Sequence, residues 1–553
     1  MVRTLLVLAL LLQAPAGRLT LEGQVVALGS NIPVPRARII LGKVGGALED
    51  YRTGVADTNG RFSFRDLTPG SYRVFTEKQG YLRGEHGRRL ASGSGTPVWL
   101  VERQPTKVTV TMIPTGVIAG RVLDGDRPAR DVLVRAMRAS FSDGQRSLAM
   151  AAWARSDDLG EYRLFGLAPG LYYVTGAPPD GARIEGDTYV VPTIPSNANK
   201  NQREIRTAAA EALAKDLVDA AAFDNSVFVP AFFPATTDET KAAAIEVQPG
   251  ATVTGIDVTI ARLPAVRVRG RIVDATGQPA QNVSVSIASR DRTSSIASAT
   301  TTAAGAFELP AVPAGRYELV ARTTTTTNRL FGTASIDVQG RDLENVDITV
   351  RPGTRLQGRV TVRGAPSDGS LSSIVVQLNG TTGFGYTALN IPPDGTFTIE
   401  NVEAREYRVR FAVRGGFKVA ESARLGAEDV TGRPFRFGPD LADTLLELVL
   451  NLAVGGIDVS AVDTSQRSVA GVTVALVPDA ARRNQSSLYR TVSTDEFGRA
   501  RLDDVPPGEY LLLTEDVDPP TWQDPEVIRR YESRGTRVRV VEKARQNVTL
   551  RIR

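Results

Sequence analysis

The sequence predicts an all-β protein built from about five consecutive β-sandwich domains, and three observations support this prediction. First, 553 residues are more than one hydrophobic core normally serves. Second, the 51 Gly and 32 Pro residues are spread along the chain, as expected where many turns join short strands. Third, one pattern of turn and apolar residues recurs five times in the same register.

The repeated pattern starts at a glycine, which we call the anchor glycine, and ends at a tyrosine twelve residues later. Apolar residues stand two, four and seven positions after the glycine, so the first two lie on one face of a strand, the core face. An Asp or Asn before the glycine, and Pro-Gly further on, favour tight turns. The anchor glycines and their tyrosines are Gly60 and Tyr72, Gly160 and Tyr172, Gly305 and Tyr317, Gly395 and Tyr407, and Gly498 and Tyr510.

Further strands are predicted on both sides of each copy. A Gly-led segment such as Gly120–Leu123 precedes it, and an alternating segment such as Val346–Val350 closes it. About seven short strands in about 100 residues are typical of an Ig-like or prealbumin-like sandwich. The predicted domains are β-sandwiches at 17–112, 113–262, 263–352, 353–451 and 452–553. Their short linkers favour a semi-rigid rod.

The second domain carries an insertion at about 177–245. Residues 199–223 are rich in Ala and predict a helix, whereas 180–198 are loop-like and 225–233 are aromatic. We interpret the insertion as an elaboration of this domain, because a closing strand at 253–260 still follows it.

The N-terminus predicts export. Arg3 precedes a short apolar stretch at 5–12, and Ala14-Pro15-Ala16 places small residues where signal peptidase reads. This pattern predicts a Sec-type signal peptide at 1–16 with cleavage after Ala16, and therefore a periplasmic, cell-surface or secreted protein. No later apolar run is long enough for a transmembrane segment.

The repeat resembles the carboxypeptidase-regulatory-like domain of bacterial proteins. Gly-x-Val, Gly277-Gln278-Pro279, Asp-x-x-Gly-x-Phe and Leu-x-Pro-Gly-x-Tyr carry this resemblance, which extends over nearly the whole mature chain. It implies a prealbumin-like, carbohydrate-binding-like sandwich, with carbohydrate as a ligand class. It says little about function, because the shared residues are turn and core residues.

The residue counts argue against an enzyme, a cofactor protein or a metalloprotein. His86 is the only histidine and there is no cysteine, so neither a His-His-Glu zinc carboxypeptidase site nor a thiolate site can form. His86 is predicted to be a solvated loop residue, and no catalytic, cofactor-binding or metal-ligating residues are predicted. A hydrolase based on paired carboxylates stays open. Asp57 and Asp157 are interpreted as turn residues rather than calcium ligands. A net charge of +5 without a basic run argues against nucleic-acid binding.

One candidate surface for a ligand or partner remains, and its residues are aromatic: Trp153, Tyr189, Phe228, Phe232 and Phe233. Two interpretations stay open: these side chains cover the insertion as an added core, or they form a platform for a sugar ring or a partner. The sequence therefore predicts a non-catalytic binding or scaffold protein, with polysaccharide as the first partner class. The alternative is a structural or adhesion protein that binds an envelope protein through an exposed sheet edge. The oligomeric state is not predicted.

Overall fold

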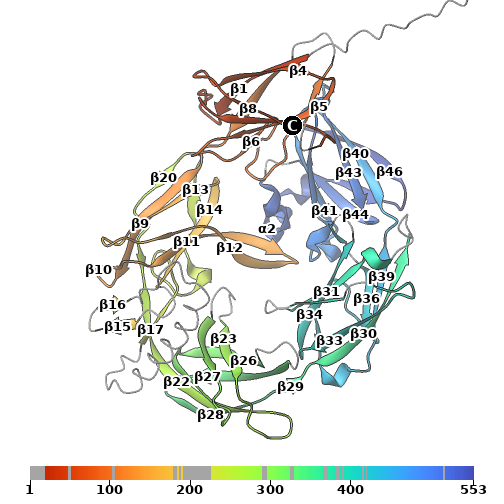
Figure 1. The fold of residues 1–553 in the computed structure, drawn as a ribbon. Coiled ribbons are helices and arrows are strands. Elements are labelled where there is room, and N and C mark those ends of the chain that lie inside the picture. The colour runs from red at the N-terminus through yellow and green to blue at the C-terminus, as the bar shows by residue number, and fades with distance from the viewer. Residues whose placement is uncertain are drawn as a thin grey trace, which may run out of the picture.

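The computed structural model shows an all-β chain in which sheets pack face to face, so the predicted fold class is confirmed (Figure 1). It describes residues 19–47, 51–101, 106–178, 183–185, 188–190, 226–288, 295–323, 329–364, 371–380, 385–388, 391–413, 416–418, 420–514 and 517–552. The predicted signal peptide at 1–16 and the predicted helix at 199–223 lie outside these ranges.

The first sandwich shows the pairing that the later ones repeat. Its opening strand β1 pairs antiparallel with β4, which carries the repeat, and parallel with the closing strand β8. This sheet consists of β1 (Leu19–Ala27), β4 (Arg61–Leu67) and β8 (Thr106–Met112). The facing sheet consists of β2 (Arg38–Lys43), β3 (Arg52–Val55), β5 (Gly70–Glu77), β6 (Gly84–Glu85) and β7 (Val98–Leu100).

The second sandwich is the most elaborated. One sheet consists of β9 (Gly116–Asp124), β10 (Arg127–Pro128), β13 (Glu161–Leu167), β20 (Thr252–Val253) and β21 (Val258–Thr259). The other consists of β11 (Leu133–Ser142), β12 (Gln145–Arg155), β14 (Gly170–Ala177), β18 (Ala231–Phe232) and β19 (Ile245–Val247). The insertion adds β15 (Arg183–Glu185), β16 (Thr188–Val190), β17 (Ser226–Val229) and η2 (Glu239–Lys241). The predicted loop at 180–198 therefore contains a β-hairpin, β15–β16.

The third and fourth sandwiches follow the same plan. The third consists of β22 (Ala261–Val273), β25 (Ala306–Pro313) and β28 (Leu343–Thr349), facing β23 (Val283–Ala288), β24 (Ser295–Thr300), β26 (Gly315–Thr323), β27 (Leu330–Val338) and β29 (Arg351–Pro352). The fourth consists of β30 (Thr354–Arg363), β33 (Thr396–Val402), β36 (Ala420–Leu425), β37 (Glu428–Asp429) and β39 (Leu446–Asn451), facing β31 (Val375–Gly380), β32 (Gly385–Ala388), β34 (Arg405–Val413), β35 (Gly416–Lys418) and β38 (Phe435–Phe437), with η3 (Leu371–Ser373) and η4 (Pro439–Leu441).

The fifth sandwich carries a helical cap on one sheet. Its sheets are β40 (Gly455–Val462), β43 (Arg499–Val505) and β46 (Arg545–Arg551), facing β41 (Thr473–Pro478), β42 (Arg490–Ser493), β44 (Gly508–Leu513) and β45 (Thr536–Val540). The cap consists of η7 (Pro519–Gln523), α2 (Pro525–Tyr531) and η8 (Glu532–Arg534), and the 3-10 turns η5 (Ala480–Arg482) and η6 (Ser486–Leu488) follow β41.

The repeat residues occupy the positions that the pattern predicts. All five anchor glycines have φ between 71° and 77°, the left-handed conformation that a tight turn requires. A Cβ at Gly60 would lie 2.5 Å from the Val25 carbonyl oxygen, so only glycine fits there. The repeat tyrosine also fixes the next turn: Tyr72 and Tyr510 each donate a hydrogen bond of 2.9 Å to the carbonyl oxygen four residues earlier.

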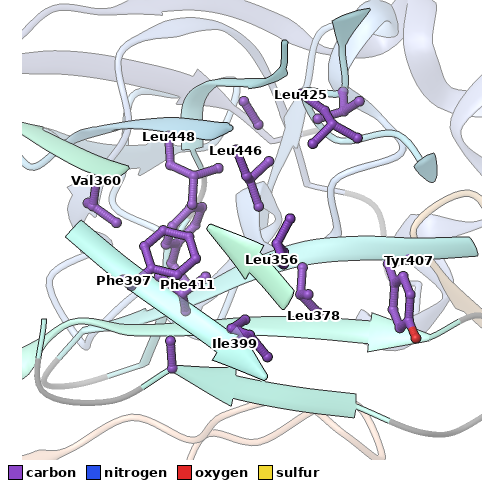
Figure 2. Packing of buried hydrophobic residues seen from close by; sticks show 14 of the residues in the cluster. Leu356, Val360, Leu378, Phe397, Ile399, Tyr407, Phe411, Leu425, Leu446 and Leu448 are labelled. Atoms are coloured by element: carbon purple, nitrogen blue, oxygen red, sulfur yellow. The ribbon is translucent and has the colours of Figure 1, made fainter. Parts of the chain in front are cut away.

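Each sandwich encloses its own hydrophobic core. Figure 2 shows this for the fourth, where Phe397 and Leu446 from one sheet meet Leu378 and Phe411 from the other. We propose domain boundaries near residues 113, 263, 353 and 452, because they divide the chain into five segments that each contain one of the five main cores.

The five sandwiches follow one another around a ring, and the fifth returns to the first (Figure 1). The predicted rod is therefore wrong. The linkers are as short as expected, since β8 ends at Met112 and β9 begins at Gly116. A short linker fixes the angle between neighbours without making it straight. Successive bends in one direction bring the ends of the array together, with polar contacts such as that from Ser92 to Asp518.

Candidate functional site: an exposed edge strand

The structure separates the five predicted aromatic residues. Trp153 lies on β12 with 58% of its surface exposed, whereas Phe232 on β18 is 7% exposed. Phe228 and Phe233 are half-buried and pack against the core of the second sandwich. Tyr189 lies on β16, which pairs with β15 in a separate two-stranded sheet. Trp153 is therefore the one member of the set whose described side chain is mainly exposed.

The phenylalanines extend the core of the second sandwich. The Phe233 backbone N–H donates a 2.9 Å hydrogen bond to the Val174 carbonyl oxygen, which ties this segment to β14. The Arg262 guanidinium lies 5.1 Å from the centre of the Phe228 ring and also pairs with Asp124. These contacts match the interpretation of an added core. The sugar platform stays a prediction that rests on Trp153.

Trp153 belongs to a long hairpin formed by β11 and β12. Asp143 and Gly144 form its turn with φ of 52° and 75°, the left-handed pair that two-residue hairpin turns favour. The strands pair from Ser142 and Gln145 at the tip to Leu133 and Arg155 at the base. β12 is the last strand of its sheet, so in the described part of the chain no strand pairs with its outer edge.

The outer edge of β12 lacks the charges and prolines that commonly protect an edge strand, although its pairing with β11 shifts register between Ala136 and Met137. Residues 147–154 include neither a charged residue nor a proline, and these are the usual means of keeping an edge from pairing. Met150 is 56% exposed and lies on the same strand as Trp153. β12 has 11 residues, whereas the corresponding strands β3, β24, β32 and β42 have 4 to 6. The second sandwich therefore presents a long, apolar edge that the others lack.

Among the residues whose burial is described, Glu85 and Glu403 are the buried glutamates, and they belong to structural contacts in different sandwiches. Glu85 Oε2 accepts a 2.9 Å hydrogen bond from the Gly95 N–H, and its Oε1 lies 3.0 Å from the Arg73 guanidinium. Glu403 lies 2.9 Å from the guanidinium of Arg322. Because they lie in the first and fourth sandwiches, these carboxylates do not form the close pair that a glycosidase requires.

His86 differs from its prediction, because it is half-buried rather than solvated. Its Nδ1 lies 3.1 Å from the Thr109 carbonyl oxygen. Burial lowers the pKa of His86 below its usual 6.5, and this outweighs the opposite effects of the Thr109 carbonyl and of Glu85. The imidazole therefore links the loop after β6 to the closing strand β8.

The turn aspartates behave as the sequence predicts. Asp57 Oδ1 accepts 2.8 Å hydrogen bonds from the N–H groups of Asn59 and Arg61. Asp157 Oδ1 accepts the two equivalent bonds in the second copy. Among the residues whose positions are described, no three His, Asp or Glu side chains gather as a metal site would need. Within the described ranges, no helix combines the length and apolar composition that a membrane span requires.

Two aspartates that join sandwiches were missed from the sequence. Asp143, at the hairpin tip, contacts the fourth and fifth sandwiches, and Asp518 contacts the first and second. The Asp143-Gly144 pair between two alternating segments is a recognisable hairpin turn and could have been found. Nothing around Asp518 marks it, because its partners come from residues about 400 positions away.

The fold and this edge define a tandem β-sandwich protein in which β12 is a long, exposed edge strand. Residues 20–113 and 267–351 match the family model of the carboxypeptidase regulatory-like domain. The chain thus contains this domain in two regions, and there the resemblance found from the sequence is confirmed. No curated protein matches the chain.

The similar solved structures include two pilins, and their sequence identity to this chain is low. A streptococcal ancillary pilin is 12% identical with a TM-score of 0.21, and the match covers 61% of this chain and all of the pilin. BcpA, the major pilin subunit of Bacillus cereus, is 10% identical with a TM-score of 0.16, covering 61% and 99%. The Bacillus anthracis TIE protein is 10% identical with a TM-score of 0.17, covering 60% of this chain but 51% of that protein. At these TM-scores the likeness carries no inference about function.

Proposed function

We propose that the chain is an exported, non-catalytic binding and scaffold protein that binds an extended segment of a protein partner along β12. The observation that carries the proposal is the exposed outer edge of this 11-residue strand, in which residues 147–154 carry no charge. The apolar stretch and small residues before Ala16 support export. The structural role of Glu85 and Glu403 supports a non-catalytic chain.

An edge strand selects its partner in two ways. Its unpaired N–H and C=O groups hydrogen-bond to any extended backbone, and its side chains select alternate residues of the added strand. Met150 and Trp153 favour apolar partner residues. Arg135 lies opposite Trp153 in the hairpin, and Arg155 follows two residues later. The favoured segment is therefore extended, alternately apolar, and acidic where it passes these arginines.

A polysaccharide is the second candidate, and the exposed indole of Trp153 favours it. Sugar rings bind to exposed aromatic faces. Carbohydrate is also the ligand class that the family resemblance implies. The two candidates differ in what they require, because a sugar needs the indole ring whereas an added strand needs the backbone edge.

The experiment uses residues 17–553 and two probes. The first is a synthetic peptide of alternating valine and threonine with a glutamate at each end, and the second is a panel of cell-wall polysaccharides. We expect saturable binding of the peptide and no binding of its version with N-methylated alternate residues, which lacks the required N–H donors. Met150→Lys should abolish peptide binding, because a charge on the edge prevents pairing.

Matched variants separate the two candidates. Val55→Lys places the same charge on the exposed short edge strand β3 and should leave peptide binding intact. Binding of a polysaccharide that is lost in Trp153→Ala but kept in Met150→Lys would support the carbohydrate candidate. Equal binding of the plain and N-methylated peptides would exclude strand addition.

A further inference from the structure

The hairpin of the second sandwich ends in a contact with two other sandwiches. At its tip, the Asp143 N–H donates a 2.6 Å hydrogen bond to Ser486 Oγ, and the Ser486 N–H donates one of 3.1 Å to Asp143 Oδ1. The other carboxylate oxygen of Asp143 pairs with the guanidinium of Arg410 on β34. The Asp143 side chain is 16% exposed. One residue of the second sandwich therefore joins the fourth and the fifth.

Asp518 makes a second junction of three sandwiches. It lies just before η7 in the cap of the fifth sandwich. Its carboxylate accepts hydrogen bonds from the Ser92 N–H at 3.0 Å and the Ser92 hydroxyl at 3.2 Å, both in the first sandwich. The Arg138 guanidinium on β11 lies 3.1 Å away. With 19% of its side chain exposed, Asp518 is anchored between the first, second and fifth sandwiches.

Other polar contacts support the closure between the first and fifth sandwiches. Arg89 donates a 3.1 Å hydrogen bond to the Ala470 carbonyl oxygen, and Ser493 donates one of 2.8 Å to that of Ser94. Arg89, Ser92 and Ser94 all lie in the loop between β6 and β7, so this loop is the contact surface of the first sandwich.

The chemistry of these contacts determines how the ring responds to salt. Interfaces between domains of one chain resemble transient protein interfaces, so relative motion is the default unless the interface is large and apolar. Here charge pairs and single hydrogen bonds join the ends of the array. Partly exposed charge pairs weaken as salt screens them, and at about 1 M salt the Debye length falls to about 3 Å. Each core lies inside its own sandwich, so salt should leave the domains folded.

We propose that Asp143 and Asp518 are latches that hold the five sandwiches in a closed ring, and that the ring opens into an extended array when the latches are neutralised or screened. The ring is thus one of two states of the same folded domains. The inference is independent of a partner at β12, because it concerns the hairpin tip rather than the strand edge.

Small-angle scattering of residues 17–553 tests the salt response. The radius of gyration should be smallest in dilute buffer and should rise at about 1 M salt, where screening is strongest. Circular dichroism should stay unchanged across the series, because the sandwiches remain folded. A radius of gyration that is extended at low salt and insensitive to salt would overturn the proposal.

The latch residues are tested by the double variant Asp143→Asn and Asp518→Asn. Asparagine keeps the shape and tolerates the positive φ of Asp143, but it removes the charge that pairs with Arg410 and Arg138. This variant should be extended already at low salt. The control Asp126→Asn with Asp158→Asn makes the same change in net charge at two exposed turn residues of the second sandwich and should stay closed. If both double variants scatter alike, the latch assignment fails.

A disulfide gives a second measurement that needs no charge change. The Ser142 and Ser486 hydroxyl oxygens lie 3.5 Å apart across the junction, and the chain has no cysteine of its own. In Ser142→Cys with Ser486→Cys, mild oxidation should form an intramolecular disulfide at low salt and much less at about 1 M salt. Ser142→Cys with Ser465→Cys, in an exposed turn of the same fifth sandwich, should not cross-link. No cross-link in the first pair at low salt would overturn the closed ring.

Discussion

The second and fifth sandwiches share the repeat, but the corresponding sheet is covered by a helical cap in the fifth and ends in an exposed strand in the second. In the fifth, β41 is buried along its whole length because the cap of η7, α2 and η8 covers the outer face of its sheet. Trp522 in this cap is 1% exposed. In the second, the corresponding sheet ends in β12, where Trp153 is 58% exposed and the edge is unpaired in the described chain.

This difference shows that the repeat determines the core, whereas the segments added to it or lengthened around it determine the surface. Anchor glycines, alternating apolar residues and the repeat tyrosine occur in both sandwiches and form equivalent cores. The segment at 517–535 hides one sheet in the fifth, whereas the longer hairpin extends the sheet in the second. A binding surface is therefore expected where a lengthened hairpin leaves a strand edge open rather than where an added segment covers a sheet.

The largest loss of stability is expected when Trp522 is replaced, and Trp153 provides the matched comparison. Trp522→Ala should destabilise the fifth sandwich by about 3–5 kcal/mol, because it empties the centre of the cluster formed with Leu511 and Ile528. Trp153→Ala should change stability by no more than about 0.5 kcal/mol, as for other exposed residues. Hydrogen exchange in β41 and β11 reports each sandwich separately. If the loss of protection that Trp522→Ala causes in β41 equalled the loss that Trp153→Ala causes in β11, the two tryptophans would not differ in structural role.

A smaller effect is expected from two glycines of the second sandwich. Both have φ near 75°, where alanine costs about 1–2 kcal/mol. At Gly160 an added Cβ would also lie 2.5 Å from the Val122 carbonyl oxygen, whereas at Gly166 nothing lies within 4 Å. Gly160→Ala should therefore destabilise the sandwich more than Gly166→Ala, as measured by hydrogen exchange in β9 and β13. If the two variants are equally stable, backbone strain alone explains the anchor glycine.

The features of the sequence that predicted the fold are those that act locally. The anchor glycines, the alternation after them and the turn aspartates depend on neighbours within about ten residues, so one chain segment is enough to reveal them. The helical cap was missed, although Val474–Val477 and Leu511–Leu513 are unbroken apolar runs. Such runs indicate a strand buried on both faces rather than one.

The candidate site was predictable only in part. The sequence singled out Trp153, but it could not separate this residue from Phe232, since both are aromatic residues of one domain. The exposure of Trp153 depends on β12 being the end strand of its sheet, and the order of strands in a sheet depends on tertiary packing. The ring was not predictable for the same reason: the contacts of Asp518 depend on the angles between five rigid bodies.

A pH effect on the first sandwich is expected from His86. Burial lowers its pKa, so the folded state favours the neutral imidazole. Its contribution to stability is therefore present above pH 6.5 and is lost as the pH falls through the lower pKa of the folded state. Protection factors of the β8 amides, which correct for the slower intrinsic exchange at low pH, should fall below pH 6.5 in the wild type. His86→Asn keeps an N–H donor near the Thr109 carbonyl but does not titrate, so the wild-type and variant rates should differ in pH dependence; parallel profiles would contradict the assignment.

The smallest change in stability is expected from single charges on the two kinds of edge. Met150→Lys on β12 and Val55→Lys on β3 replace side chains that are both more than half exposed, so each should shift the free energy of unfolding by no more than about 0.5 kcal/mol. Their effects on association should differ, because a long edge with eight consecutive uncharged residues is a template for another strand and a four-residue edge is not. Light scattering during refolding at high protein concentration should therefore fall in Met150→Lys and stay at the wild-type level in Val55→Lys. Equal light scattering from the wild type and both variants would mean that the β12 edge is covered in solution. An open edge would then no longer distinguish the second sandwich from the fifth.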